Sequence, residues 1–158
     1  AIREISNNLS PHVLESFGLL PALKAFTGKI TESKIISIGI EGNIQGKRFS
    51  QNVEISLYRV LCELINNTLR HSGAGKVHIR LVEADGYLFV SYRDNGKGLP
   101  SGTNLSDHSG MGFSNIESRL KAINGKIELN TSDFKGFSVS ITCPLKVEPI
   151  ESKNSGNE

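Results

Sequence analysis

The chain has 158 residues, 37% of them hydrophobic and 22% charged, and a formal net charge of +2. This size and composition fit one globular domain with a sizeable core. The near balance of charges, with no Lys/Arg run, indicates no nucleic-acid partner, and no apolar stretch is long enough to cross a bilayer.

Two cysteines bear on the compartment of the protein. Cys62 lies in a helical pattern and Cys143 in a strand pattern, so we expect two reduced core residues rather than a disulfide. Reduced thiols fit a cytoplasmic location. Because the sequence begins at Ala1, inside a helical pattern, we also expect it to be part of a longer protein.

Helical patterns occupy the first thirty residues. Ile2, Ile5 and Leu9 recur at helical spacing. Pro11 suits the first turn of a second helix, and Pro21 can begin a third that runs towards residue 29. The apolar stripe of this segment indicates that it docks against another part of a protein.

Strand and helix patterns alternate in the middle of the chain. Residues 34–42 show a period of two, which predicts a half-buried strand. Residues 51–71 give the clearest helical pattern, and residues 77–92 predict a hairpin turned at Asp85-Gly86. The inner face of the long helix is expected to consist of Leu57, Leu61, Leu64, Ile65 and Thr68.

The last third of the chain completes the expected fold. Residues 100–110 have almost no apolar side chains, which predicts a mobile loop. A helix over residues 113–123 and strands over 126–131 and 137–143 follow, and the polar residues 146–158 are expected to be disordered. These elements predict an α/β two-layer sandwich: a mixed, mainly antiparallel sheet is covered on one face by helices and preceded by an N-terminal helical segment.

Four polar residues share one face of the long helix. Glu63 and Asn67 are four residues apart, and Arg70 and His71 lie one turn further on. The amide oxygen of Asn67 is a suitable Mg²⁺ ligand, Glu63 can orient or deprotonate a nearby water or hydroxyl, and Arg70 can reach phosphate oxygens. Taken alone, the four residues are more simply explained as a solvated helix face.

A glycine-rich turn follows the second strand of the hairpin, with Asp94, Gly96, Lys97 and Gly98. A carboxylate at Asp94 can accept the exocyclic amine of adenine, and the two glycines let the backbone approach the base closely. The order Asp-Asn-Gly is also common in ordinary turns, so this stretch alone does not identify a site.

A third block, Gly110-Met111-Gly112, leads into the helix expected over residues 113–123. The first backbone amides of that helix are free to bind phosphate. A lone pair of glycines at this spacing is too common to identify a function by itself.

Taken in order, the three blocks resemble the N, G1 and G2 boxes of the ATP-binding domain of sensor histidine kinases. The resemblance spans about residues 34–145. The Bergerat-type fold of that domain is shared with DNA gyrase, the mismatch-repair ATPases and a heat-shock chaperone. Finer details, such as Asn67-Thr-Leu-Arg70-His71-Ser72, are most similar to the nitrate-sensor and desaturase-sensor branch. The three matching blocks are Glu63-x-x-x-Asn67, Asp94-x-Gly96-x-Gly98 and Gly110-x-Gly112.

The resemblance implies a site for ATP and Mg²⁺. Asn67 would hold Mg²⁺, Asp94 would recognise adenine, and residues 99–112 would form a lid over the nucleotide. Glu63 occupies the place of the general base in the gyrase-type members. The other residues implied in nucleotide binding are Arg70, His71, Gly96, Lys97, Gly98, Gly110, Met111 and Gly112.

The resemblance also implies how the chain is divided. Residues 1–30 would be the end of the second dimerisation helix and its link, residues 31–147 the ATP-binding catalytic domain, and residues 148–158 a disordered tail. In this branch an acidic residue follows the phosphate-accepting histidine, and none of the four histidines here has that neighbour. The chain is therefore expected to pass the γ-phosphoryl of Mg·ATP to a histidine on a dimerisation domain that it lacks, and not to phosphorylate itself.

The same resemblance implies partners for the parent protein. That protein would be a homodimer that serves a response regulator, and an anchor in the inner membrane is compatible with it. Two alternatives stay open. One is an anti-sigma-factor-type serine kinase, although such kinases usually begin near the first strand. The other is a nucleotide-sensing interaction module without transfer activity, which the Glu63 and Asn67 pair makes less favoured.

Overall fold

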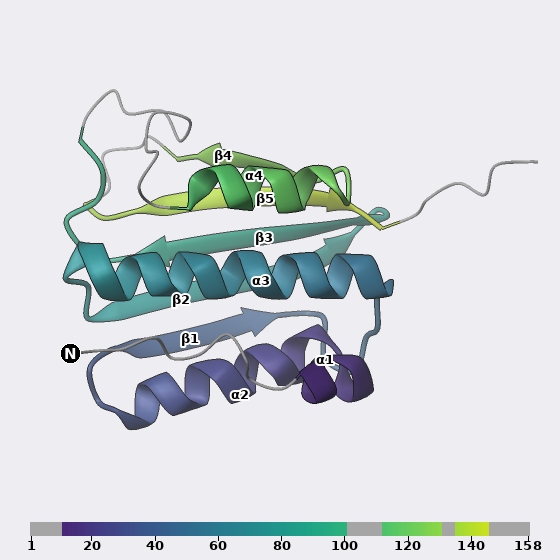
Figure 1. The fold of residues 1–158 in the computed structure, drawn as a ribbon, viewed down its shortest axis with the longest axis horizontal. Coiled ribbons are helices and arrows are strands. Elements are labelled where there is room, and N and C mark those ends of the chain that lie inside the picture. Colours follow the sequence, from purple (N-terminus) through teal and green to yellow (C-terminus); the bar gives the residue numbers. More distant parts are fainter. Residues whose placement is uncertain (1–10, 101–111, 131–134, 146–158) are drawn as a thin grey trace, which may run out of the picture.

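The computed structural model describes residues 11–100, 112–130 and 135–145 (Figure 1). No helix in this part of the chain is both long and apolar enough to span a membrane. The elements, in chain order, are α1 Pro11–Phe17, α2 Leu19–Glu32, β1 Ser37–Gly42, α3 Gln51–Asn67, the π-helical turn η1 Thr68–Ser72, β2 Lys76–Ala84, β3 Tyr87–Asp94, α4 Phe113–Lys121, β4 Lys126–Leu129 and β5 Ser138–Pro144.

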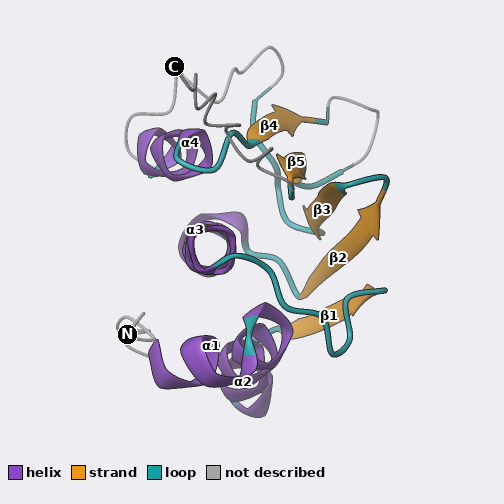
Figure 2. Cartoon of the chain, turned by 90° about the vertical axis from the view of Figure 1, so that its right-hand side faces the viewer, coloured by secondary structure: helices purple, strands orange, loops and turns teal. Residues whose placement is uncertain are grey.

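The five strands form one sheet in the order β1-β2-β3-β5-β4. Strand β1 runs parallel to β2, and the other three pairings are antiparallel. Figure 2 shows the helices gathered on one face of this sheet, so the predicted two-layer sandwich with a mixed sheet is confirmed. The predicted hairpin is also present: Asp85 and Gly86 both have positive φ, as a tight turn between twisted strands requires.

Helix α3 is the centre of the helical layer (Figure 2). The side chain of Ser50 caps its first turn by accepting a hydrogen bond from the backbone N–H of Val53 at 3.4 Å. All five residues predicted for its inner face are buried, at 3% exposure or less. They pack towards the buried side chains of the central strands, among them Ile79, Leu81, Val90, Val139 and Ile141. This packing holds α3 along the sheet.

Helix α2 is packed into the same core. Its apolar residues Leu19, Leu23, Phe26 and Ile30 recur at helical spacing and are fully buried. The ring of Phe26 meets that of Tyr58 on α3 edge to face at 6.4 Å. The helix starts two residues before the predicted Pro21, because proline is tolerated in a first turn whose N–H groups have no helical partner.

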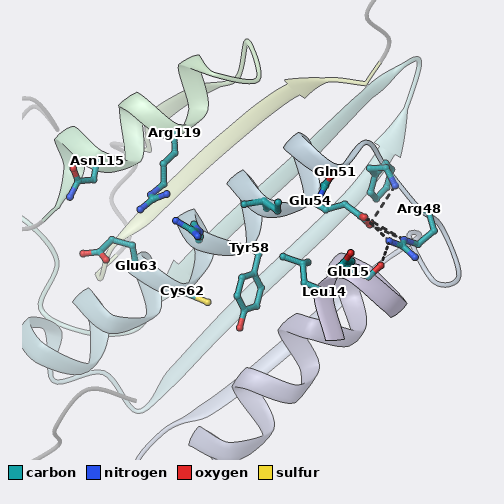
Figure 3. A pocket seen from close by; sticks show the side chains of 13 residues that line it. Leu14, Glu15, Arg48, Gln51, Glu54, Tyr58, Cys62, Glu63, Asn115 and Arg119 are labelled. Atoms are coloured by element: carbon teal, nitrogen blue, oxygen red, sulfur yellow. Dashed lines mark hydrogen bonds and ion pairs between the residues drawn. The ribbon is translucent and has the colours of Figure 1, made fainter. Parts of the chain in front are cut away.

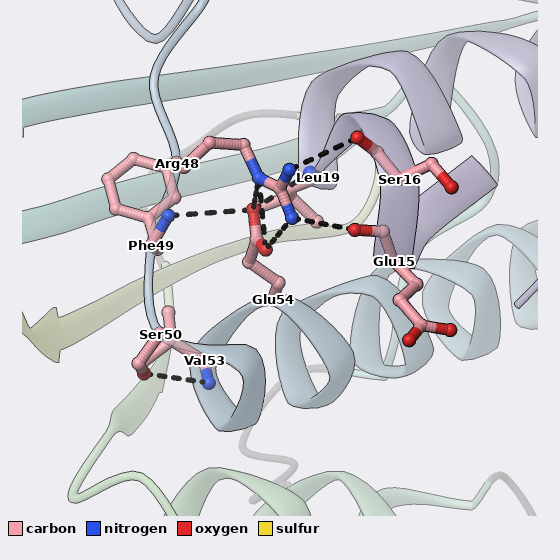
Figure 4. A network of polar contacts seen from close by, with 8 residues as sticks. All are labelled: Glu15, Ser16, Leu19, Arg48, Phe49, Ser50, Val53 and Glu54. Atoms are coloured by element: carbon pink, nitrogen blue, oxygen red, sulfur yellow. Dashed lines mark hydrogen bonds and ion pairs between the residues drawn. The ribbon is translucent and has the colours of Figure 1, made fainter. Parts of the chain in front are cut away.

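An ion pair between the buried Glu54 and the half-exposed Arg48 ties this helical segment to the start of α3 (Figure 4). Arg48 binds the carboxylate of Glu54 through Nη2 at 3.0 Å and Nε at 3.2 Å. Arg48 also donates to the backbone carbonyls of Glu15 and Ser16 in α1, and Glu54 accepts the backbone N–H of Leu19. One carboxylate and one guanidinium therefore join α1, α2 and α3.

Both cysteines are free and buried, which confirms the expected reduced core thiols. Burial raises the pKa of Cys62 to about 12 and that of Cys143 to about 11. Both thiols therefore stay protonated at neutral pH and behave as small apolar residues of the core.

Candidate functional site

Asp94 ends strand β3 and is buried, with 2% of its surface exposed. Its Oδ2 accepts a hydrogen bond from the hydroxyl of Thr68 at 2.8 Å. Its Oδ1 accepts the backbone N–H groups of Gly96 at 2.9 Å and Phe137 at 3.3 Å. These contacts come from three separate segments and fix the carboxylate in one orientation.

A cavity of about 530 Å³ opens beside this carboxylate, which is within the usual size range of small-molecule sites. Its polar end is built from the end of α3, the turn η1 and the loop after β3. Its apolar wall includes the stacked rings of Phe113 and Phe137, whose centroids lie 6.0 Å apart. The lining residues are Leu64, Asn67, Thr68, His71, Ser72, Asp94, Lys97, Gly98, Leu99, Pro100, Phe113 and Phe137.

Two glycines of the loop after β3 are required by its geometry. A Cβ on Gly96 would lie 2.5 Å from the backbone oxygen of Ser72, so only glycine lets the loop rest against the end of the helix. Gly98 has a φ of +68°, and a Cβ there would lie 2.6 Å from the backbone oxygen of Gly136. The backbone N–H of Lys97 donates to the Ser72 oxygen at 2.9 Å and closes this contact.

The predicted long helix does not continue as an α-helix to His71. Helix α3 ends at Asn67, and the π-helical turn η1 follows until Gly73, whose φ is +63°. A π-helical turn adds a residue to the turn, so Thr68, His71 and Ser72 all reach the cavity wall together with Asn67. No sequence pattern indicated this change, because a helical periodicity does not distinguish a π turn at a helix end.

Five of the predicted site residues therefore share one cavity: Asn67, His71, Asp94, Lys97 and Gly98. Asn67 is buried, with 7% of its surface exposed, whereas His71 and Lys97 are exposed at the rim. Gly96 supports the loop from behind, against Ser72. Gly110 and Met111 lie outside the described residues, as does most of the predicted lid over 99–112.

Besides Gly96, three predicted residues lie outside the cavity wall. Arg70 is exposed and lines no described cavity. Glu63 lies one helical turn before Asn67 and lines a second hollow instead. Gly112 packs against Glu63, so closely that a Cβ at Gly112 would overlap its carboxylate. Glu63 and Gly112 are thus adjacent to each other, and the roles of all three residues stay predictions.

A second hollow, of about 720 Å³, follows the outer face of α3 between α1 and α4 (Figure 3). Glu63, Asn115 and Arg119 lie at one end of it, and Arg48 and Glu54 at the other. It is larger than the first hollow, but its buried acid Glu54 is already paired with Arg48, and no glycine is among the described residues that line it. The smaller cavity is therefore the better candidate for a nucleotide.

Asn67 is the residue expected to bind magnesium, and it lines the cavity. Among the described residues, no group of three or more His, Cys, Asp or Glu could hold a metal ion. Mg²⁺ commonly binds through one or two protein oxygens, and phosphate oxygens and water complete its shell. The buried amide of Asn67 on the cavity wall fits that mode, in which the nucleotide carries most of the ligands.

Comparison with known proteins decides the family. A model of the histidine kinase-, DNA gyrase B- and HSP90-like ATPases matches residues 52–147, which include α3, η1, the loop after β3 and α4. The chain belongs to this ATPase family. The predicted family resemblance is thereby confirmed, although the matches do not separate one branch of the kinases from another.

Two curated relatives of this ATPase-family chain are named as histidine kinases. The histidine-protein kinase/phosphatase DegS of Brevibacillus brevis is 29% identical over 147 residues, which cover 93% of this chain and 38% of that protein. The sensor histidine kinase MctS of Rhizobium johnstonii is 33% identical over 137 residues, which cover 84% of this chain and 29% of that protein. The chain thus spans well under half of the length of either relative.

A solved structure supports the fold. The catalytic domain of the histidine kinase ThkA superimposes with a TM-score of 0.66 at 18% sequence identity. The match covers 80% of this chain and 90% of that domain. The match confirms that this ATPase-family chain has the expected ATP-binding fold over most of its length.

Proposed function

We propose that this chain is the ATP-binding catalytic domain of a sensor histidine kinase and that it transfers the γ-phosphoryl group of ATP to a histidine on a separate dimerisation domain. The observation that carries the proposal is the buried carboxylate of Asp94 at the wall of a cavity that Asn67 and the glycine loop also line. The family and the printed names of the two relatives support the same function.

The cavity offers a separate group to each part of the nucleotide. Asp94 accepts the exocyclic amine of adenine, and the rings of Phe113 and Phe137 provide an apolar wall for the base. Lys97 at the rim brings a positive charge towards the phosphates. Asn67 would hold Mg²⁺ through its amide oxygen, and the bound ion would neutralise charge on the phosphate oxygens.

We assign to Glu63 a role at the acceptor histidine. It lies one turn from Asn67 and against Gly112, on the side of α3 that faces the second hollow. Transfer forms a bond between an imidazole nitrogen and the γ-phosphorus and breaks the bond to the bridging oxygen, which leaves with ADP. Glu63 can hydrogen-bond the other ring N–H, which orients the attacking nitrogen and stabilises the positive charge that develops on the ring.

Asn67→Ala should remove most of the Mg²⁺ dependence of ATP binding. Loss of the one side-chain oxygen that we assign to the metal is expected to reduce the enhancement of ATP affinity by Mg²⁺ about tenfold. Calorimetric titrations with and without Mg²⁺ measure this directly. Asn66→Ala is the matched control, because Asn66 is buried to a similar extent on the same helix but does not line the cavity. An unchanged Mg²⁺ dependence of the Asn67 variant would refute the assignment.

Phosphotransfer in trans tests the proposed function. The chain alone should bind radiolabelled ATP without becoming labelled, because none of its four histidines has the acidic neighbour of the expected acceptor. The dimerisation domain of the parent protein, added separately, should become labelled slowly, because the covalent link that raises the local concentration is missing. An acid-labile label on this chain alone, lost on replacement of His12 or His71, would overturn the proposal. Labelling of a serine in the added protein would favour the serine-kinase alternative.

A further inference from the structure

Two buried hydroxyl groups stand behind the carboxylate of Asp94. Thr68, in the turn η1, is 3% exposed, and Tyr92, two residues before Asp94 on β3, is fully buried. The hydroxyl of Thr68 lies 2.8 Å from Oδ2 of Asp94 and also contacts the hydroxyl of Tyr92. The hydroxyl of Tyr92 lies 3.1 Å from the backbone oxygen of Leu64. The chain of contacts thus runs from the core to the cavity.

The direction of these hydrogen bonds follows from counting protons. A carboxylate only accepts, so the single proton of the Thr68 hydroxyl points to Asp94. Thr68 must then accept in its contact with Tyr92, and Tyr92 shares its single proton between the Thr68 hydroxyl and the backbone oxygen of Leu64, to which it also donates. The carbonyl of Leu64 does not depend on Tyr92, because it also receives the backbone N–H of Thr68. Burial raises the pKa of Tyr92, so this donor keeps its proton at neutral pH.

The same count leaves one acceptor position on Asp94. A carboxylate has about four lone-pair positions. On Oδ1, the backbone N–H groups of Gly96 and Phe137 take two of them. On Oδ2, the hydroxyl of Thr68 takes a third, and Thr68 itself lines the cavity beside Asp94. The remaining lone pair of Oδ2 is the one available to a donor in the cavity.

We infer that Thr68, supported by Tyr92, is a positioning residue that aims this last lone pair of Asp94 at a donor group and thereby makes the site selective for a 6-amino purine. The inference rests on the proposed function, in which the cavity holds the base of ATP. A base with a carbonyl at the same place meets an acceptor that cannot turn away, because three hydrogen bonds hold it. Selectivity therefore arises from the fixed orientation of the carboxylate as well as from its charge.

The test compares nucleotides that differ at one position of the base. Thr68→Val keeps the branched shape and removes the hydroxyl, and Thr68→Ser keeps the hydroxyl. We expect Thr68→Val to weaken ATP about tenfold, in line with the loss of a hydrogen bond to a charged group, and to weaken purine riboside triphosphate, which lacks the amine, less than about twofold. Thr68→Ser should keep the selectivity of the wild type. Calorimetry gives each dissociation constant.

Two further variants keep the test decisive. Tyr92→Phe removes only the donor behind Thr68 and should lower the ratio of the two affinities about threefold, less than Thr68→Val does. Thr27→Val is the matched control: Thr27 is a buried threonine on α2, outside the cavity wall, whose hydroxyl donates to the backbone oxygen of Lys24. If Thr68→Val does not fold, Tyr92→Phe and Thr68→Ser provide the comparison.

The outcomes separate the inference from the proposed function. A wild-type chain that does not bind ATP contradicts the proposed function itself. A wild-type chain that prefers ATP, with variants that weaken both nucleotides equally or keep the wild-type ratio, contradicts the positioning role alone. The positioning role is established if the ratio of ATP affinity to purine riboside triphosphate affinity falls in Thr68→Val and Tyr92→Phe but not in Thr68→Ser or Thr27→Val.

Discussion

Asp94→Asn is expected to reduce ATP affinity at least about a hundredfold, because the exocyclic amine of adenine then meets an amide that donates where a carboxylate accepted. The fold should survive the change. An amide oxygen in place of Oδ1 can still accept the backbone N–H groups of Gly96 and Phe137. The amide nitrogen can donate to the Thr68 hydroxyl, whose proton then turns to Tyr92, so every hydrogen bond around the site has a substitute.

Calorimetry with ATP and a thermal melting curve measure the two parts of this prediction separately. Asp85→Asn is the matched control: it makes the same chemical change at an exposed turn position with a φ of +52°, a conformation that asparagine tolerates. We expect wild-type ATP affinity and a nearly unchanged melting temperature for that control. Unchanged ATP affinity in the Asp94 variant, with a normal melting curve, would rule out the adenine contact.

The reversed hydrogen bonds add a further expectation for the same variant. The donor that replaces the acceptor should favour a carbonyl on the base, so the affinity for inosine triphosphate should rise relative to that for ATP. A variant that loses ATP and inosine triphosphate equally would indicate damage to the cavity rather than a change in base recognition.

Much of the fold follows from local sequence patterns. The apolar periodicity of α3, the alternation in β2 and β3, and the Asp85-Gly86 turn each depend on residues that are close together in the chain, and each agrees with the structure. The sheet order has no such local signal. The mainly antiparallel character of the sheet was predictable, because the hairpin and the later strands suggest antiparallel pairing. The insertion of β5 between β3 and β4 is seen only in the structure.

The candidate site divides in the same way. Asp94 and its two glycines were predictable, because an acid and close backbone approach leave a local motif. The contribution of Thr68 was not, because it was assigned only to the inner face of a helix. It bonds Asp94 across 26 residues of sequence, and the π-helical turn that presents it to the cavity leaves no separate pattern. Contacts between residues so far apart in sequence depend on tertiary packing, which leaves no pattern in a short stretch of sequence.

For the helical segment before β1, docking was predictable from the sequence but the docking partner was not. The apolar stripe of this segment predicted that it docks against another part of a protein, and the structure shows that α2 packs into the same hydrophobic core as α3 and the sheet. The polar contacts of that docking involve Arg48 and Glu54, and no sequence motif predicts that these two residues bind α1 and α2. The proposed boundary between the dimerisation link and the catalytic domain stays a prediction, but the packing of α2 makes its presence important for stability.

Glu54→Ala is therefore expected to destabilise the domain by about 2–3 kcal/mol, because it removes a buried carboxylate that accepts hydrogen bonds from Arg48 and from two backbone N–H groups. The side chain of Glu54 is 4% exposed, and its carboxylate receives Arg48 together with the backbone N–H groups of Leu19 and Phe49 (Figure 4). Its loss leaves these donors without their acceptor at the junction of α1, α2 and α3. Such a loss is a large part of the total stability of an ordinary domain.

An exposed ion pair next in sequence provides the control. Lys47 and Glu83 lie 3.1 Å apart, with 43% and 33% of their side chains exposed. Glu83→Ala removes the same charge from the chain and should cost less than about 1 kcal/mol, as surface pairs do. Urea denaturation of both variants gives the comparison, and equal losses would show that the Arg48–Glu54 pair does not hold the helices together.

A double variant separates the contribution of the two charges from that of side-chain packing. Arg48→Met combined with Glu54→Leu removes both charges and restores apolar packing, so it should be markedly more stable than Glu54→Ala. The backbone N–H of Leu19 still loses its acceptor in this variant, so part of the loss should remain. Recovery of most, but not all, of the lost free energy of unfolding is therefore the expected result. A double variant no more stable than Glu54→Ala would mean that the backbone contacts of Glu54, rather than its ion pair with Arg48, join α2 to the rest of the core.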